Sequence, residues 1–453
     1  MTTRDKNKVR DAIYAQRDPF VRLAHEIHEH PQLAFTEEYA AARITEVLAD
    51  ERFNVRKGVF GLPTAFIASF GHGPLHVAFC AEYDALPPSC LFDRSKPPDL
   101  MDVWLSPERQ DTPLRHACGH NLIAGAAVAA ATGLRDIADE VGLTVSVFGT
   151  PGEELAGLPE PPADIRGPGK ALLLEAGAFE GVHAALMVHP FPTPFGVIIP
   201  SKAHVRVRAR FTRAGAGGRV LGPVEMQRLG EALKQSIISL HQVPVLYVTQ
   251  PEGQKTSAQT DILWIAPTLD EANRAREPVR RCFEEAASSA GVAVDVTDYL
   301  PFPEMRHDPI LAASYRKNAE ALGRVRGRDE NLQEELRKIL PWWARIIKRF
   351  FPGLVAPGLF MDKFPVEITY GTDLANVSHV IPAIHPFIGI GGMAAPHSAE
   401  FAGQADTDEA YRAMMDGGVS LAWTALDAAT DPALRDYLLK AASSRVGSST
   451  RTV

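Results

Sequence analysis

The chain has 453 residues, of which 45% are hydrophobic and 23% are charged, and its formal net charge is -8. This composition is ordinary for a globular protein, and the length exceeds what one hydrophobic core usually covers, so we expect two domains. The acidic balance argues against nucleic acid as a partner. No apolar run is long enough to cross a bilayer, so we expect no membrane span. The polar N-terminus and four cysteines without a disulfide spacing predict a cytoplasmic protein.

The first part of the chain alternates predicted helices and strands. Residues 4–50 are expected to be helical and include three histidines, His25, His28 and His30. A spacing of three residues places His25 and His28 on one helical face, so a metal site and a structural role both fit the pattern. Two strands and a helix are then expected at 55–70, 75–80 and 124–134. Alternation of this kind up to about residue 200 indicates an α/β domain.

A second pattern begins at residue 201. Strict alternation over 203–211 predicts a strand with one basic, exposed face. A helix, a strand, a helix and a strand are then expected at 226–241, 262–266, 270–290 and 292–296. This order is typical of the ferredoxin-like split βαβ arrangement, an open sheet with two helices on one face. We therefore predict an inserted domain over 201–303 and a first domain made of 1–200 and 304–445.

The C-terminal part holds one unusual segment. Residues 332–351 are amphipathic and basic, with Trp342 and Trp343 adjacent. A membrane-surface helix is one interpretation. We favour an inserted helix that covers the core or an oligomer interface, because the chain carries no other membrane signal. Small polar residues near the end predict a flexible tail over 446–453.

Residue types that bind metals recur beside the predicted strand ends. Cys118 and His120 lie two positions apart before a predicted helix, and this pair favours a transition metal over calcium or magnesium. Glu153 and Glu154 follow a buried strand, and adjacent carboxylates there need a cation or a shared proton. Two further candidates follow a strand and a glycine-rich turn: His189 and His397. Ligands far apart in sequence but close to strand ends suit an α/β enzyme.

Six short motifs also occur along the chain in a fixed order. They read A-E-Y-D-A-L-P (81–87), H-A-C-G-H-N (116–121), G-T-P-G-E-E (149–154), L-E-A-G-A-F (174–179), M-V-H-P (187–190) and G-T-D-L-A-N-V-S-H-V-I-P (371–382). Together they resemble the aminoacylase and hippurate-hydrolase type of metallopeptidase, over nearly the whole chain. The resemblance is closest to the amidohydrolase branch that includes aminobenzoyl-glutamate hydrolase and the β-alanyl dipeptidases. It implies an α/β catalytic domain with a mixed central sheet flanked by helices, and an inserted ferredoxin-like lid that mediates dimerisation.

The resemblance also implies roles for the candidate residues. It implies one or two divalent transition-metal ions per subunit, manganese, zinc or cobalt. Five residues match the metal ligands of the family: Cys118, His120, Glu154, His189 and His397. Glu153 matches the general base, and Asp84 matches the aspartate that orients a ligand histidine. Spacing alone does not separate base from ligand between the adjacent glutamates. The histidines of the first helical region match structural positions of the family.

Four segments depart from the family pattern around the expected site. Insertions at 88–114 and 155–169 are expected to wall the pocket and to bring two candidate substrate contacts, Trp104 and Arg166. In the lid, R-A-G-A-G-G places Gly217 where the family has a histidine that stabilises the oxyanion of the tetrahedral intermediate. The lid stretch T-S-A-Q-T-D, which ends at residue 261, is the fourth departure. The residues predicted to make good the missing histidine are Arg213, Arg219 and His204.

The leading hypothesis is a divalent-metal hydrolase that cleaves the C–N bond of a small carboxylate-bearing amide, an N-acyl amino acid or a dipeptide. The missing lid histidine leaves a second hypothesis open, an aminohydrolase that replaces the amino group of an aminobenzoate such as 5-nitroanthranilate by hydroxide. There the negative charge enters the ring, so no carbonyl oxyanion forms. A third hypothesis is a metal-binding protein without catalysis, which has no need for Glu153. The expected partners are a small-molecule substrate and further copies of the chain, in a homodimer or a higher oligomer.

Overall fold

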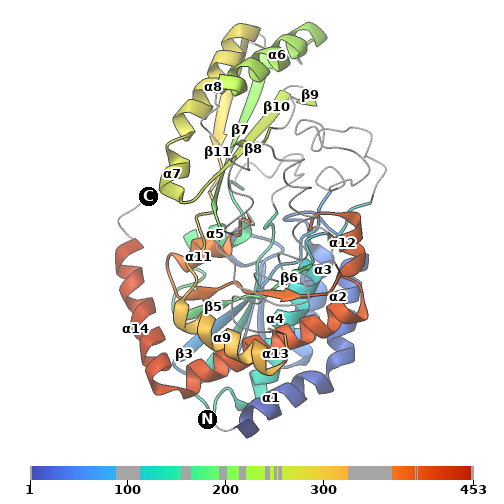
Figure 1. Ribbon diagram of the computed structural model, residues 1–453, viewed down its shortest axis with the longest axis vertical. Helices are drawn as coiled ribbons and strands as arrows, with labels where there is room; N and C mark the ends of the chain where they lie inside the picture. Colours follow the sequence, from blue (N-terminus) through green and yellow to red (C-terminus); the bar gives the residue numbers. More distant parts are fainter. Residues whose placement is uncertain are drawn as a thin grey trace, which may run out of the picture.

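The computed structural model describes residues 3–87, 113–154, 165–192, 201–213, 221–239, 245–248, 252–253, 258–324, 370–392, 394 and 396–449. The predictions for most of the two insertions, for Trp104, for the segment 332–351, for Gly217 and for Arg219 lie outside these residues. Figure 1 shows a large part built around a central sheet and a smaller lid that carries α6 and α8. None of the helices in the described ranges combines the length and the apolar composition needed to cross a membrane.

The large part contains a mixed six-stranded sheet in the order β1-β2-β4-β3-β5-β12. Its strands are β1 (Asn54–Lys57), β2 (Phe66–Phe70), β3 (Leu75–Ala81), β4 (Leu143–Gly149), β5 (Ala184–Leu186) and β12 (Ala383–Ile384). β4, β3, β5 and β12 run parallel to one another, while β1 and β2 pair antiparallel. A second, parallel pair joins β6 (His189–Phe191) to β13 (Phe387–Gly389). The mixed central sheet is as the sequence predicted, although the strand expected over 55–70 is two strands separated by a short 3-10 turn.

Helices cover this sheet, as Figure 1 shows. They are α1 (Thr3–Ala15), α2 (Arg17–Glu29), α3 (Glu38–Asp50), α4 (His120–Leu134), α5 (Gly169–Glu175), α9 (Pro309–Ala321), α11 (Leu374–Ser378), α12 (Ala399–Gln404), α13 (Asp408–Thr430) and α14 (Pro432–Ser449). α14 continues to Ser449, so the first residues of the tail that the sequence predicted as flexible are helical.

The central helix α4 is buried along its whole length because its sequence is small and apolar. Small residues let it approach α13 closely. A Cβ added at Gly125 would lie 2.2 Å from Met414 Sδ, and one at Gly418 would lie 3.0 Å from Ala126 O. Close packing of this kind, together with burial of the apolar side chains, stabilises the helix and fixes its first turn against the sheet. That first turn carries a predicted metal ligand, His120.

The lid sheet has the order β11-β7-β10-β8, with β9 paired to β10. Its strands are β7 (Ala203–Arg213), β8 (Val245–Val248), β9 (Glu252–Gly253), β10 (Ala258–Ala266) and β11 (Val292–Asp298), and its helices are α6 (Pro223–Ser239), α7 (Leu269–Asn273) and α8 (Arg276–Ala290). All its strand pairs are antiparallel. This is the predicted ferredoxin-like arrangement, except that the helix expected over 270–290 is broken into α7 and α8.

We expect the lid strand 203–211 to pair or pack with its copy in a second subunit, and the structure excludes pairing by this strand. β7 lies between β10 and β11, so its backbone groups are already paired and cannot pair with a second copy of β7. Its basic face is also largely covered. Arg206 is buried and donates to Asp261, and Arg208 donates to the same carboxylate at 2.8 Å. Arg206 and Arg208 therefore neutralise a buried acid on the neighbouring strand, and of the three arginines within 203–211 only Arg210 is exposed.

Candidate active site

The carboxyl ends of the parallel strands bring the predicted site residues together. Asp84 follows β3, Glu153 and Glu154 follow β4, and His189 follows β5. Because these strands are neighbours and parallel, their carboxyl ends meet at one edge of the sheet. The positions between these strand ends and the next elements are the common place for a site in an open α/β sheet.

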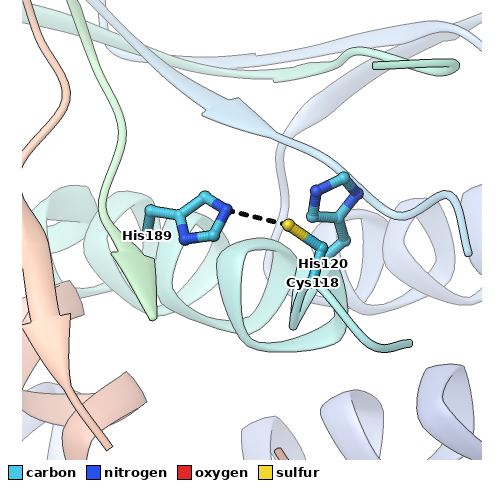
Figure 2. Close-up of side chains that lie close together, drawn as sticks. All are labelled: Cys118, His120 and His189. Carbon is cyan, nitrogen blue, oxygen red and sulfur yellow. Dashed lines mark hydrogen bonds between the residues drawn. The ribbon is translucent and has the colours of Figure 1, made fainter. Parts of the chain in front are cut away.

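The backbone conformation between Cys118 and His120 explains why a glycine, Gly119, separates them in the H-A-C-G-H-N motif. The φ of Gly119 is +80°, a conformation that favours glycine, and this residue forms the N-cap of α4. A Cβ at this position would lie 2.5 Å from Pro190 Cγ, next to His189. The glycine thus lets the chain turn sharply between Cys118 and His120 and come close to the third ligand. Figure 2 shows these three side chains pointing toward one another.

The five predicted ligands form two groups that share one cysteine. Cys118, His120 and His189 have ligand atoms that all lie within 4.8 Å of one another, and the same holds for Cys118, Glu154 and His397. Cys118 Sγ lies 3.3 Å from His189 Nε2, and Glu154 Oε1 lies 3.2 Å from His397 Nε2. The two groups would each hold one ion, and Cys118 would contribute to both.

Asp84 lies where an orienting carboxylate is needed. His120 Nδ1 donates to Asp84 Oδ1 at 2.7 Å, which leaves His120 Nε2 directed at the ligand atoms. The other oxygen of Asp84 accepts the backbone N–H of Glu154 at 2.9 Å. One buried aspartate therefore fixes the tautomer of one ligand and the position of another. A contact of this kind orients a ligand and raises its basicity.

The two adjacent glutamates have opposite electrostatic environments. Burial, together with Glu82 and Glu154 nearby, holds the pKa of Glu153 well above its usual range. Burial also raises the pKa of Glu154, but His397 outweighs it and brings that pKa to about 2. Glu154 is thus ready to bind a cation, while Glu153 is the more basic of the two carboxylates. This difference matches the predicted roles of ligand and base.

His397 is held in an unusual backbone conformation. Its φ is +62°, which is uncommon for any residue other than glycine. The backbone N–H of His397 donates to Ala117 O at 2.8 Å, and the next residue, Ser398, caps α12. These contacts offset the strain of the backbone and hold the imidazole of His397 beside Cys118. Backbone strain of this kind is concentrated at functional sites.

The structure reveals a buried ionic group that the sequence did not predict. Lys170 Nζ donates to Glu82 Oε1 at 2.5 Å and to Asp373 Oδ1 at 2.6 Å, and its backbone N–H donates to Asp373 Oδ2 at 2.8 Å. All three side chains are at most 1% exposed. Glu82 Oε2 lies 3.3 Å from His120 Nε2. The group therefore lies directly behind the metal ligands, and two of its members belong to quoted motifs, A-E-Y-D and G-T-D.

Replacing Lys170 by methionine is expected to lower the free energy of unfolding by about 3–5 kcal/mol, because it leaves two carboxylates buried without a cation. Urea unfolding of the variant and the native protein measures this difference. The exposed Lys317→Met is the control and is expected to stay within about 0.5 kcal/mol. A loss below about 1 kcal/mol for Lys170→Met would show that the buried group does not need its cation.

The candidate substrate contacts are placed less favourably. Arg213 lies at the far end of β7 and forms an ion pair with Glu225 at 3.0 Å. The side chain of Arg166 is exposed, and its carbonyl accepts from Leu300 N. His204 lies where the lid joins the large part, with its ring against Gly371 and its Nε2 buried without a partner among the described residues. Of the described candidates, His204 alone offers an unused buried atom.

The three histidines of α2 and the turn after it mainly connect helices. His28 Nε2 contacts Ala402 O in α12 at 2.9 Å, and His30 Nδ1 contacts Glu26 O. His25 Nδ1 lies 2.8 Å from Asp406 Oδ1, and with Glu29 these residues form an exposed group of metal-ligand types. The contact with α12 agrees with the structural role that the family resemblance implies.

The donor set fits divalent transition metals. Cysteine sulfur, imidazole nitrogen and carboxylate oxygen are the ligands that zinc and related ions take. His120 Nε2 and Glu154 Oε1 are buried without a hydrogen-bond partner in the described part of the chain. Burial lowers the pKa of His120, but Asp84 and Glu82 outweigh it and raise it to about 9. A site that draws a proton to a buried imidazole in this way attracts positive charge.

Comparison with known proteins agrees with this site. No family model matches the chain. A protein named Xaa-Arg dipeptidase from Mus musculus is 27% identical over 445 residues, which cover 92% of this chain and 87% of that protein. One of the subunits of p-aminobenzoyl-glutamate hydrolase from Escherichia coli is 26% identical over 464 residues, covering 94% and 92%.

Solved structures share the fold. A dinuclear metal-binding peptidase of the M20 family from Bacillus subtilis matches with a TM-score of 0.56 and 20% identity, covering 91% of this chain and 99% of that one. An aminobenzoyl-glutamate utilization protein from Klebsiella pneumoniae matches with a TM-score of 0.55 and 12% identity, covering 91% and 98%. These similarities span almost the whole chain. The chain is therefore similar over almost its whole length to a dipeptidase and to a subunit of an aminobenzoyl-glutamate hydrolase, and it shares its fold with a dinuclear metal-binding peptidase.

Proposed function

We propose that this protein hydrolyses the C–N bond of a small amide that carries a carboxylate, either an N-acyl amino acid or a dipeptide. One observation carries the proposal: two ligand groups share Cys118, and Glu153 lies beside them with a raised pKa. The names of the relatives support it, because a dipeptidase and an aminobenzoyl-glutamate hydrolase both cleave an amide next to a carboxylate. A metal-dependent hydrolase is the function class that fits both.

The residues divide the chemistry among them. Cys118, His120 and His189 would hold one ion, and Cys118 with Glu154 and His397 the other. Bound ions lower the pKa of a coordinated water and polarise the bond under attack. Glu153 takes the proton of the attacking water and passes it to the leaving nitrogen. Its raised pKa suits this role, because the base must keep that proton until the C–N bond breaks.

The identity of the metal, the cellular location, the substrate and the oligomeric state are further proposals. We propose manganese, zinc or cobalt as the metal, because the mixed sulfur, nitrogen and oxygen donors suit these ions. The cytoplasmic location, the small-molecule substrate and the homo-oligomer predicted from the sequence stay predictions. A dimer built by strand pairing in the lid would use the end strands β8 and β11, since β7 is internal.

The aromatic aminohydrolase remains the second candidate, and a group of rings favours it. The ring centroid of His189 lies 5.3 Å from that of Phe387, which in turn lies 4.9 Å from the ring of Tyr370. A planar aromatic acid would stack well beside such rings. The third hypothesis, a metal-binding protein without catalysis, does not account for a buried base beside the ligands.

A substrate panel tests the proposal. Metal-loaded protein is offered N-acyl amino acids, p-aminobenzoyl-glutamate, dipeptides with C-terminal arginine, β-alanyl dipeptides and substituted aminobenzoates, and released amine and ammonia are measured separately. We expect amine release from a small amide, and release slower by about a hundredfold to ten-thousandfold from the Glu153→Gln variant. Ammonia release from an aminobenzoate would favour the aminohydrolase instead. Cleavage of long peptides without turnover of any small amide would contradict both.

A further inference from the structure

A buried imidazole that the chemistry above does not use lies beside the metal ligands. His385 occupies the short connection between β12 and β13. β12 pairs with β5, and β13 pairs with β6. The connection that holds His385 therefore runs alongside the connection from β5 to β6, which leads into His189. The ring centroids of His385 and His189 are 5.4 Å apart. His385 therefore lies at the same sheet edge as the ligands.

Neighbouring groups fix the orientation of His385. Its backbone N–H donates to His307 Nδ1 at 3.3 Å, and its ring stacks on Tyr370 with centroids 5.4 Å apart and an interplanar angle of 22°. Phe387 closes the other side, 5.1 Å away at 72°. The carbonyl of Pro386 accepts the backbone N–H of His189 at 2.9 Å. His385 is thus held from several sides, and the neighbouring backbone is hydrogen-bonded to His189. A side chain held in this way is pre-organised for one contact.

Among the described residues, one ring atom of His385 has no hydrogen-bond partner. His385 is 1% exposed, and its Nδ1 is buried without a hydrogen-bond partner among the described residues. A buried polar atom without a partner is costly and uncommon in native proteins. In this site the same condition holds for His120 Nε2 and Glu154 Oε1, which are directed at metal positions. His385 belongs to none of the groups of metal-ligand atoms in the described chain, so this geometry does not offer a metal ion as the partner of its Nδ1.

We propose that His385 is a substrate-binding residue that hydrogen-bonds a polar group of the substrate through Nδ1. Tyr370 and Phe387 form with it a wall that favours a planar, aromatic acyl or aryl group beside the metal ions. The inference rests on the proposed function and narrows its substrate class to aromatic acids and their amides. A hydrogen bond from a rigid imidazole orients the substrate, and the flanking rings select its shape.

Three variants of His385 test the contact. Asparagine places an amide near the position of Nδ1, glutamine reaches toward the position of Nε2, and leucine removes both. Manganese-loaded proteins are compared by their kcat/KM on p-aminobenzoyl-glutamate and by their bound metal. We expect His385→Leu to lower kcat/KM by about ten- to a hundredfold with native metal content. His385→Asn should recover most of the loss, and His385→Gln should not.

Two controls separate a contact from a structural effect. His76→Leu changes a largely buried histidine on β3 far from the carboxyl ends and should leave kcat/KM unchanged. Tyr370→Leu should lower kcat/KM for an aromatic acyl group more than for an acetyl group. Native kcat/KM in His385→Leu would overturn the proposal, as would loss of metal from that variant. If the leucine variant does not fold, equal activities of the asparagine and glutamine variants would also overturn it.

Binding of 4-aminobenzoate separates this inference from the proposed function. Titration calorimetry with the manganese-loaded protein measures binding without turnover. If the native protein hydrolyses nothing in the panel, the proposed function fails, but His385 is still tested by whether leucine weakens 4-aminobenzoate binding. Binding that is equal in the native protein and in His385→Leu would overturn the role of His385 even if the hydrolase proposal holds.

Discussion

Replacing Cys118 by alanine is expected to remove both metal ions and reduce activity to background, because its sulfur belongs to both ligand groups. Each remaining group would keep only two ligands, too few for a stable site of a transition metal. The protein should stay folded, since Cys118 is only partly buried and lies before α4. Metal content after dialysis, activity and circular dichroism measure the three effects.

The matched control for this variant is Cys282→Ala. Cys282 is a buried cysteine in the lid core, away from the ligands, so its replacement should leave metal content unchanged. His189→Ala should remove the ion of one group and retain the other, because His189 belongs to one group only. Chelation of the native protein should abolish activity, and manganese, zinc or cobalt should restore it. Full activity after exhaustive chelation would contradict the metal-dependent function itself.

Replacing Glu153 by glutamine is expected to lower turnover by about a hundredfold to ten-thousandfold while both ions remain bound. The amide has the shape of the carboxyl group but cannot accept the proton of the attacking water. Steady-state kinetics and metal analysis on the same preparation separate the two effects. Glu154→Gln is the internal control, and it should lose metal because Glu154 lies with Cys118 and His397 in one ligand group.

The opposite result would exchange the roles of Glu153 and Glu154. If Glu153→Gln loses metal while Glu154→Gln keeps it and becomes slow, the roles of the adjacent glutamates are exchanged. The raised pKa of Glu153 and the pKa of about 2 for Glu154 argue for the first as the base and the second as the ligand. The difference arises because the His397 ring contacts the carboxylate of Glu154.

The sequence by itself determined which residues are candidate ligands and their order along the chain. A cysteine and a histidine around glycine, two adjacent glutamates after an apolar strand, and single histidines after later elements all lie where they were expected. These features are local, because residue type, strand ends and turns depend on near neighbours in the chain. The ferredoxin-like lid followed in the same way from the order of its elements.

Tertiary structure decided which distant residues meet. Lys170 reaches Glu82 across 88 positions and Asp373 across 203, and a lone lysine in the first turn of a helix gives no local sign of either contact. The position of β7 inside the lid sheet depends likewise on strand order. The same is true of the ion pair between Arg213 and Glu225 and of the position of His385 beside His189. Strand order is set by the packing of the whole core. The local sequence pattern therefore fixes which residue types are available as ligands, and only the folded chain fixes which other residues surround them.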